Sequence, residues 1–219
     1  MKYRWLIGAT SAAEVGSGLI VATALGAFAG PRAVRAFAGQ QTPQVASVGT
    51  GVASADAAQA EAFPALQRAP RPEDAGATDP ALLQGLARAQ QQFEVNPSLG
   101  RAVLADPSTR LYIYPGRGVV CFGAVSSKYG TTVGCNATSE ALRQGLGSQI
   151  TVGPASFISG VLPAGAHDVA VTDGSGARTP VTLTSDGGYS LQLAAEGRLL
   201  TYVAGDGTHR QQELQELYQ

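Results

Sequence analysis

The stretch from Leu111 to Cys135, LYIYPGRGVVCFGAVSSKYGTTVGC, decides the fold class of this chain. Its first two runs, LYIY and VVCFGAV, are rich in β-branched and aromatic residues, and the turn sequence PGRG separates them. Two such runs around a Pro/Gly turn are typical of a β-hairpin. The stretch therefore predicts that the ordered part of the chain is built from antiparallel strands.

Alternating apolar and polar residues return between His167 and Asp206, in the segments HDVAVTD, TPVTLTSD, GYSLQLA and RLLTYVAGD. Asp-Gly pairs at 173–174, 186–187 and 206–207 follow these segments, where tight turns need a positive φ. We expect an antiparallel meander with one buried and one polar face. The fold class is therefore mainly β, as a small antiparallel β-sandwich or a partly open barrel.

Two short helices are expected before the strands. Asp79 and Pro80 form an N-cap and first-turn pair, and apolar residues recur at helical spacing from Leu82 to Phe93. Asn96-Pro97 repeats the start signal before a second, shorter apolar pattern. We expect both helices to cover an edge or a face of the sheet.

The N-terminus has the character of an export segment. Two basic residues precede a run from Trp5 to Gly30 in which Glu14 is the single charge. Small residues in A-x-A form end at Ala29 and again at Ala38. This pattern predicts a secretory signal peptide over residues 1–30, and an uncleaved membrane anchor is the alternative. Both place the rest of the chain outside the cytoplasm, secreted or held at the membrane.

Residues 31–79 are rich in Ala, Gly, Ser, Gln and Pro and carry few large apolar side chains. A segment of this kind buries too little surface to offset its ordering entropy. We expect a flexible linker here, a β-rich domain over residues 80–207, and a polar tail over residues 208–219.

The two cysteines, Cys121 and Cys135, lie on the second run of the hairpin and on the return that follows it. Two thiols without a matching histidine pair are too few ligands for a zinc site, and no C-x-x-C redox motif is present. For an exported protein we expect one structural disulfide, with two free buried thiols as the alternative.

The motifs LYIYPGRGVVC, SEALRQG and SGVLPAG followed by DVAVTDGSG, together with the second cysteine, resemble uncharacterised envelope proteins of high-GC Gram-positive bacteria. The resemblance covers about residues 96–203. It implies an extracytoplasmic location and a similar architecture, and it implies no catalytic mechanism.

Composition excludes several classes of function. The net charge is −1 and charged residues make up 14% of the chain, so we expect no nucleic acid partner. The sequence lacks the serine-hydrolase elbow, the zinc-protease motif and the phosphate-binding loop. We expect no metal and no cofactor, since no calcium loop surrounds the Asp-Gly pairs.

Two pairs of residues remain as candidates for a site. Tyr112 and Tyr114 share one face of a strand and are a candidate binding surface, for instance as a stacking platform for sugars. His167 and His209 are the two histidines that a hydrolase acting on cell-wall or extracellular material could use. The sequence favours a non-catalytic module that binds or supports another envelope component, a protein or a polysaccharide. Its membrane contact is expected through the N-terminal segment alone.

Overall fold

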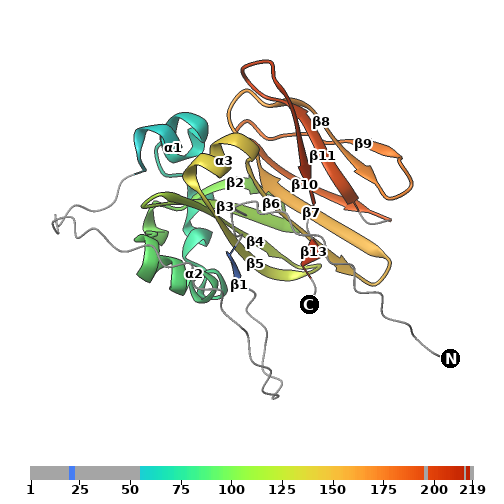
Figure 1. The fold of residues 1–219 in the computed structure, drawn as a ribbon. Coiled ribbons are helices and arrows are strands. Elements are labelled where there is room, and N and C mark those ends of the chain that lie inside the picture. The colour runs from blue at the N-terminus through green and yellow to red at the C-terminus, as the bar shows by residue number, and fades with distance from the viewer. Residues whose placement is uncertain (1–19, 23–54, 195–196, 215, 218–219) are drawn as a thin grey trace, which may run out of the picture.

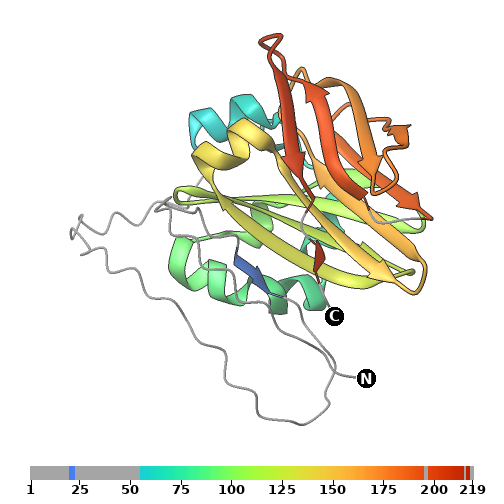
Figure 2. The ribbon, with the colours of Figure 1, turned by 45° about the vertical axis from the view of Figure 1, so that its right-hand side comes forward.

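The computed structural model describes residues 20–22, 55–194, 197–214 and 216–217. The described chain forms three β-sheets stacked in layers, with helix α2 against the outer face of the first sheet (Figures 1 and 2). All strand pairs but one are antiparallel within this part of the chain. The mainly β, antiparallel architecture is therefore confirmed.

The first sheet contains the hairpin that the sequence predicted. Its strand order is β1-β5-β4-β3-β2. Arg117 and Gly118 form the turn between β3 and β4, and Gly118 has the positive φ of 73° that this turn requires. The strand bounds are β1 Ile20–Ala22, β2 Arg101–Ala105, β3 Thr109–Gly116, β4 Val119–Ser126 and β5 Gly130–Ala137.

The second and third sheets follow after helix α3, Thr138–Gln144. The second has the order β10-β7-β6-β13, in which β13 runs parallel to β6. Its strands are β6 Leu146–Val152, β7 Ala155–Val161, β10 Gly188–Leu193 and β13 Glu216–Leu217. The third has the order β12-β11-β8-β9. Its strands are β8 His167–Asp173, β9 Arg178–Pro180, β11 Gly197–Val203 and β12 His209–Glu213.

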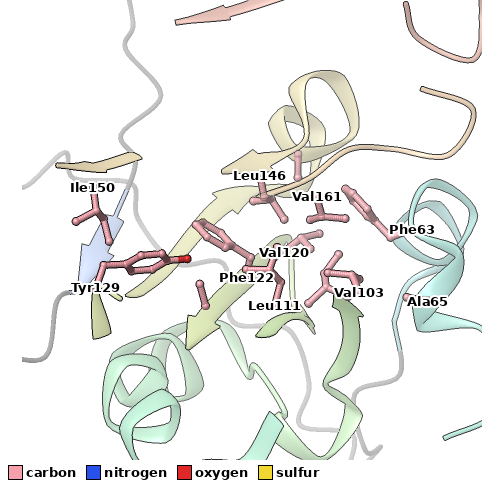
Figure 3. Close-up of a cluster of buried hydrophobic side chains, with 13 residues drawn as sticks. Phe63, Ala65, Val103, Leu111, Val120, Phe122, Tyr129, Leu146, Ile150 and Val161 are labelled. Atoms are coloured by element: carbon pink, nitrogen blue, oxygen red, sulfur yellow. The ribbon is translucent and has the colours of Figure 1, made fainter. Parts of the chain in front are cut away.

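Three clusters of buried side chains hold these layers together. The cluster between the first and second sheets includes Leu111, Phe122, Leu146 and Val161 (Figure 3). A second cluster lies between the first sheet and α2, and a third lies between the second and third sheets. Strand β4 is therefore buried on both faces, and this is why it reads as an almost continuous apolar run. The one buried and one polar face expected for the later meander do not extend to the first sheet.

Of the two predicted helices, the structure contains the first. Helix α2 spans Pro80–Phe93, and the side chain of Asp79 caps it by accepting a hydrogen bond from the amide of Ala81. At the second site there is only the single 3-10 turn η3, Pro97–Leu99. The apolar residues that follow belong to strand β2, because they pack into the sheet rather than along a helix.

The predicted linker is wrong for residues 55–79. This segment forms helix α1, Ala57–Ala62, and two 3-10 helices, η1 Pro64–Leu66 and η2 Pro72–Thr78. Phe63 and Ala65 are both fully buried in the cluster between the first two sheets. Figure 3 shows Phe63 beside Val161 at one end of that cluster. The folded domain therefore begins about 25 residues earlier than expected, at residue 55 of the described chain.

Polar contacts also fix this segment to the sheets. The buried amide of Gln59 donates to the carbonyl oxygens of Gly116 and Val119 at 2.9 and 3.0 Å, and to the hydroxyl of Thr138 at 2.8 Å. The first two bonds satisfy backbone carbonyl groups at the β3–β4 turn, and the third joins Gln59 to the side chain of the first residue of α3. Composition did not reveal them, since glutamine is a usual linker residue.

A buried ion-pair cluster completes the attachment. Asp74 accepts a bidentate hydrogen bond from Arg68 at 2.7 and 2.8 Å, and further bonds from the backbone amides of Arg71 and Ala102. Arg68 also contacts Asp186, with its Nε 3.3 Å from the carboxylate. The cluster thus joins η2, strand β2 and the turn before β10.

The predicted disulfide is confirmed. Cys121 and Cys135 face one another in the β4–β5 register and are bonded, with their Cα atoms 4.0 Å apart. The bond joins positions that are 14 residues apart in sequence. In the chain-entropy account, closing a loop of this size contributes about 3 kcal/mol. It holds β5 to β4, the central strand of the first sheet.

The predicted polar tail is also corrected. Residues His209–Glu213 form strand β12, and Glu216–Leu217 form strand β13. Strand β12 appears polar in sequence because it lies at the edge of the third sheet, with alternate residues exposed.

Most of the predicted export segment and the first part of the predicted linker lie outside the described residues. Ile20–Ala22 is described, as strand β1 against β5. Within the described residues, no helix combines the length and apolar character needed to cross a bilayer.

Candidate functional site

The tyrosine pair predicted as a binding surface is not at the surface. Tyr112 and Tyr114 share one face of β3 as expected, but α2 and the η2 segment cover that face. The hydroxyl of Tyr114 donates to the carbonyl oxygen of Ala77 at 3.0 Å. Burial raises the pKa of both phenols above the usual value. The pair is part of the core, and the prediction of a binding role for it is wrong.

A groove of about 620 Å³ lies on the third sheet instead. Three smaller residues, Pro180, Ala170 and Thr201, form its floor, and Gln211 continues this row on the fourth strand. Longer side chains surround the floor, from β9 on one side to β12 on the other. The third sheet is the outermost layer of the molecule (Figures 1 and 2), and its opposite face is apolar and packs on the second sheet. The groove therefore lies on the solvent side of this layer.

A β-bulge shapes one end of this groove. The register of β8 on β11 shifts between the pairs Thr201–Ala170 and Val203–His167, so that β8 has one extra residue there. The bulged segment of β8, between His167 and Ala170, contains Asp168, which has a φ of 53°. A non-glycine residue in this left-handed region costs about 1–3 kcal/mol. Such bulges redirect side chains at binding sites, and Asp168 lines the groove.

Several polar groups in the groove are free to bind. In the described part of the chain, the side chains of Arg178, His209 and Gln211 form no hydrogen bond and no ion pair. Arg178 supplies N–H donors, and the amide of Gln211 supplies both a donor and an acceptor. The carboxylate of Asp168 is largely exposed and adds a second acceptor. The groove can therefore satisfy a ligand that has both donors and acceptors.

The two histidines lie on either side of one strand. Val203 of β11 pairs with His167 of β8 on one side and with His209 of β12 on the other. His167 contacts the carbonyl oxygen of Gly165 at 3.0 Å through Nδ1, and its Nε2 lies 3.9 Å from Asp168. Among the described residues, neither histidine is hydrogen-bonded to a Ser, Thr or Cys side chain. This arrangement shows no activated nucleophile.

A second groove, of about 410 Å³, lies between α1, α3 and the β11–β12 turn. Three of its four charged groups are already engaged: Arg143 pairs with Glu140 at 2.7 Å, and Arg210 contacts Asp206 at 3.4 Å. The fourth, the carboxylate of Glu61, forms no hydrogen bond or ion pair within the described chain. This second groove has fewer free polar groups than the groove on the third sheet. The described residues contain no cluster of three or more metal-ligating side chains.

Sequence reasoning missed the groove because its residues come from strands at the two ends of the third sheet. Arg178 lies two residues before Pro180, and Gln211 was assigned to the polar tail. The exposed residues of β12, His209, Gln211 and Glu213, alternate with Arg210 and Gln212, which are also polar, so the sequence shows no apolar–polar alternation that would indicate a strand. Comparisons with models of protein families, with curated proteins and with solved structures found no match.

Proposed function

We propose that this protein is a non-catalytic, extracytoplasmic module that binds a component of the cell envelope through the groove on the third sheet. One observation carries the proposal: an open groove on the outermost layer is lined by polar side chains without partners in the described chain. Polar groups that have no partner within the protein can exchange their hydrogen bonds to water for hydrogen bonds to a ligand.

The lining indicates the type of contact. The groove combines a floor of small side chains with hydrogen-bonding groups of both kinds, and its charges include both a carboxylate and guanidinium groups. Such a surface suits a polar ligand of low net charge. Among the residues that line it, Tyr202 is the single aromatic residue and is itself buried, so stacking on an exposed ring is not part of the interaction.

The location outside the cytoplasm rests on the N-terminal sequence and agrees with the disulfide between Cys121 and Cys135. Structural disulfides persist in oxidising compartments and are rare in the cytosol. The proposed setting is a secreted protein, or one held at the membrane by its N-terminal segment.

The proposal is tested by retention of the purified protein on cell-envelope fractions. We expect the double substitution Arg178→Ala and Gln211→Ala to reduce retention at least tenfold, as loss of two polar anchors at about 1 kcal/mol each would do. The matched control replaces Arg88 and Gln91, an exposed Arg and Gln on α2, with alanine. Equal retention of both double variants and the wild type would exclude the groove as the contact surface.

A further inference from the structure

Strand β5 lies beside the three-residue strand β1 and becomes an edge of the first sheet once β1 is removed, and it lacks the usual protection of an edge. It pairs with β4 over all eight positions from Gly130 to Ala137, without a bulge. Its sequence, GTTVGCNA, has no charged residue and no proline. A long, regular and uncharged edge presents a row of backbone N–H and C=O groups to any other extended chain.

Three other edge strands are protected, whereas the six-residue edge strand β10 of the second sheet, GYSLQL, is uncharged and regular like β5. Strand β2, at the opposite edge of the first sheet, has a register shift between Ala102 and Leu104 and begins with Arg101. Strand β9 is three residues long and ends with Pro180. Strand β12, HRQQE, carries the charged residues Arg210 and Glu213 and is polar throughout. These are the features by which natural sheets prevent edge-to-edge pairing, and β5 has none of them.

In this structure, residues Ile20–Ala22 lie on the β5 edge, antiparallel and paired with Cys135, Gly134 and Val133. The same three residues lie within the segment that we propose directs export. A cleaved signal leaves the protein, and an anchor lies in the membrane. In either case these residues cannot also cover β5.

We infer that, in the exported protein, the β5 edge accepts an extended segment of another protein, which adds a strand to the first sheet. Strand addition of this kind gains its affinity from main-chain hydrogen bonds, and neighbouring side chains provide selectivity. The inference rests on the proposed export, and it concerns a surface different from the groove.

The surroundings of β5 define the partner. Val133 and Cys135 are buried on the α2 side of the strand, and a Cβ placed on Gly134 would lie 2.6 Å from the ring of Phe122. The edge is therefore apolar on one face and closely packed on the other. It suits an uncharged segment of small and β-branched residues, as the sequence Ile20-Val21-Ala22 itself is. The disulfide fixes β5 before binding, which lowers the ordering cost of complex formation.

A labelled peptide with the sequence of residues 16–26, GSGLIVATALG, tests the inference on protein recovered after export. We expect saturable binding, weakened at least tenfold when the peptide carries Val21→Pro, because proline removes an amide donor from the strand. On the protein, Thr131→Lys should weaken binding severalfold by placing a charge at the edge. The matched control, Thr179→Lys on β9, should leave the affinity unchanged.

Three results would overturn the inference. The first is that the exported protein fails to bind the peptide. The second is that the Val21→Pro peptide binds as tightly as the unchanged peptide. The third is that the protein forms a dimer that the peptide dissociates. The last result would make a second copy, and not another protein, the occupant of the edge. If the protein were found only in the cytosol with Met1 retained, the proposed function would be contradicted. The failure of the proposed function and the failure of this inference are therefore distinguished by different measurements.

Discussion

Replacing Phe63 with alanine is expected to lower the free energy of unfolding by about 3–5 kcal/mol, the range for a large aromatic residue removed from a core. The ring is fully buried between the first and second sheets, and the neighbouring side chains come from several strands that cannot all move inward to fill the space. Urea denaturation of the full chain, followed by near-ultraviolet circular dichroism, measures the loss as a lower midpoint with an unchanged slope.

The control for this variant is Val152→Ala, at an exposed apolar position, which should change the unfolding free energy by less than about 0.5 kcal/mol. A second measurement uses trypsin. Arg68 lies five residues after Phe63, and its cleavage should require unfolding in the wild type and become faster in Phe63→Ala. An unchanged midpoint and immediate cleavage after Arg68 would show that residues 55–79 are the linker that composition suggested.

The second large effect is expected for Asp74→Ala. This change leaves Arg68 buried with only Asp186 as a charged partner and leaves the amide of Ala102 without an acceptor. Removing one member of a buried ion pair costs about 3–5 kcal/mol, because the remaining charge has lost its compensation. Glu140→Ala, which breaks the surface pair with Arg143, should cost at most about 1 kcal/mol and is the control.

The effect of Asp74 depends on pH in a definite direction. Burial by itself would raise the pKa of this carboxyl, but the hydrogen bonds from Arg68 and from the amides of Arg71 and Ala102 outweigh it and lower the pKa from 3.8 to about 2. A carboxyl with a lowered pKa in the folded state stabilises the protein above its unfolded pKa, and the contribution is lost as the pH falls through the folded value. The difference between wild type and Asp74→Ala should be largest near pH 7 and should shrink between pH 4 and pH 2. A difference that is constant down to pH 2 would contradict the assigned role of the carboxylate.

The sequence predicted the fold class well where local patterns decide the structure. The hairpin around Arg117-Gly118, the disulfide and the cap of α2 at Asp79 all depend on residues close together in the chain, and all three are confirmed. Two of the three Asp-Gly pairs also adopt the expected geometry, with a φ of 79° at Gly187 and Gly207. In the third, the positive φ occurs at Gly176 instead. There the side chain of Asp173 accepts three hydrogen bonds from its own turn, from the amide and the hydroxyl of Ser175 and from the amide of Ala177.

The predictions failed where a contact joins distant parts of the chain. Residues 55–79 are poor in apolar side chains, yet Phe63 fills a space between two sheets and Gln59 binds a turn 57 residues away. Averaged composition cannot show a single anchor of this kind. Likewise Tyr112 and Tyr114 were predicted to form a binding surface, but a helix that lies earlier in the chain covers them. No local sequence pattern specifies which face of the sheet that helix covers.

The candidate site was unpredictable for the same reason. Its residues come from β8, β9, β11 and β12, and they converge only because the third sheet brings the last polar strand beside the others. The histidines were identified from sequence, but the structure separates them across β11 and brings neither of them to a hydroxyl or thiol nucleophile in the described residues.

The central proposal is that the groove on the third sheet binds the envelope, and hydrogen exchange tests it most directly. The exchange of backbone amides is measured for the wild-type protein alone and in the presence of an excess of cell-envelope fraction. We predict slower exchange in the peptides that contain β8, β11 and β12, and unchanged exchange in α2 on the opposite side of the molecule. Slowed exchange in α2, with none in the strands of the third sheet, would contradict the proposal.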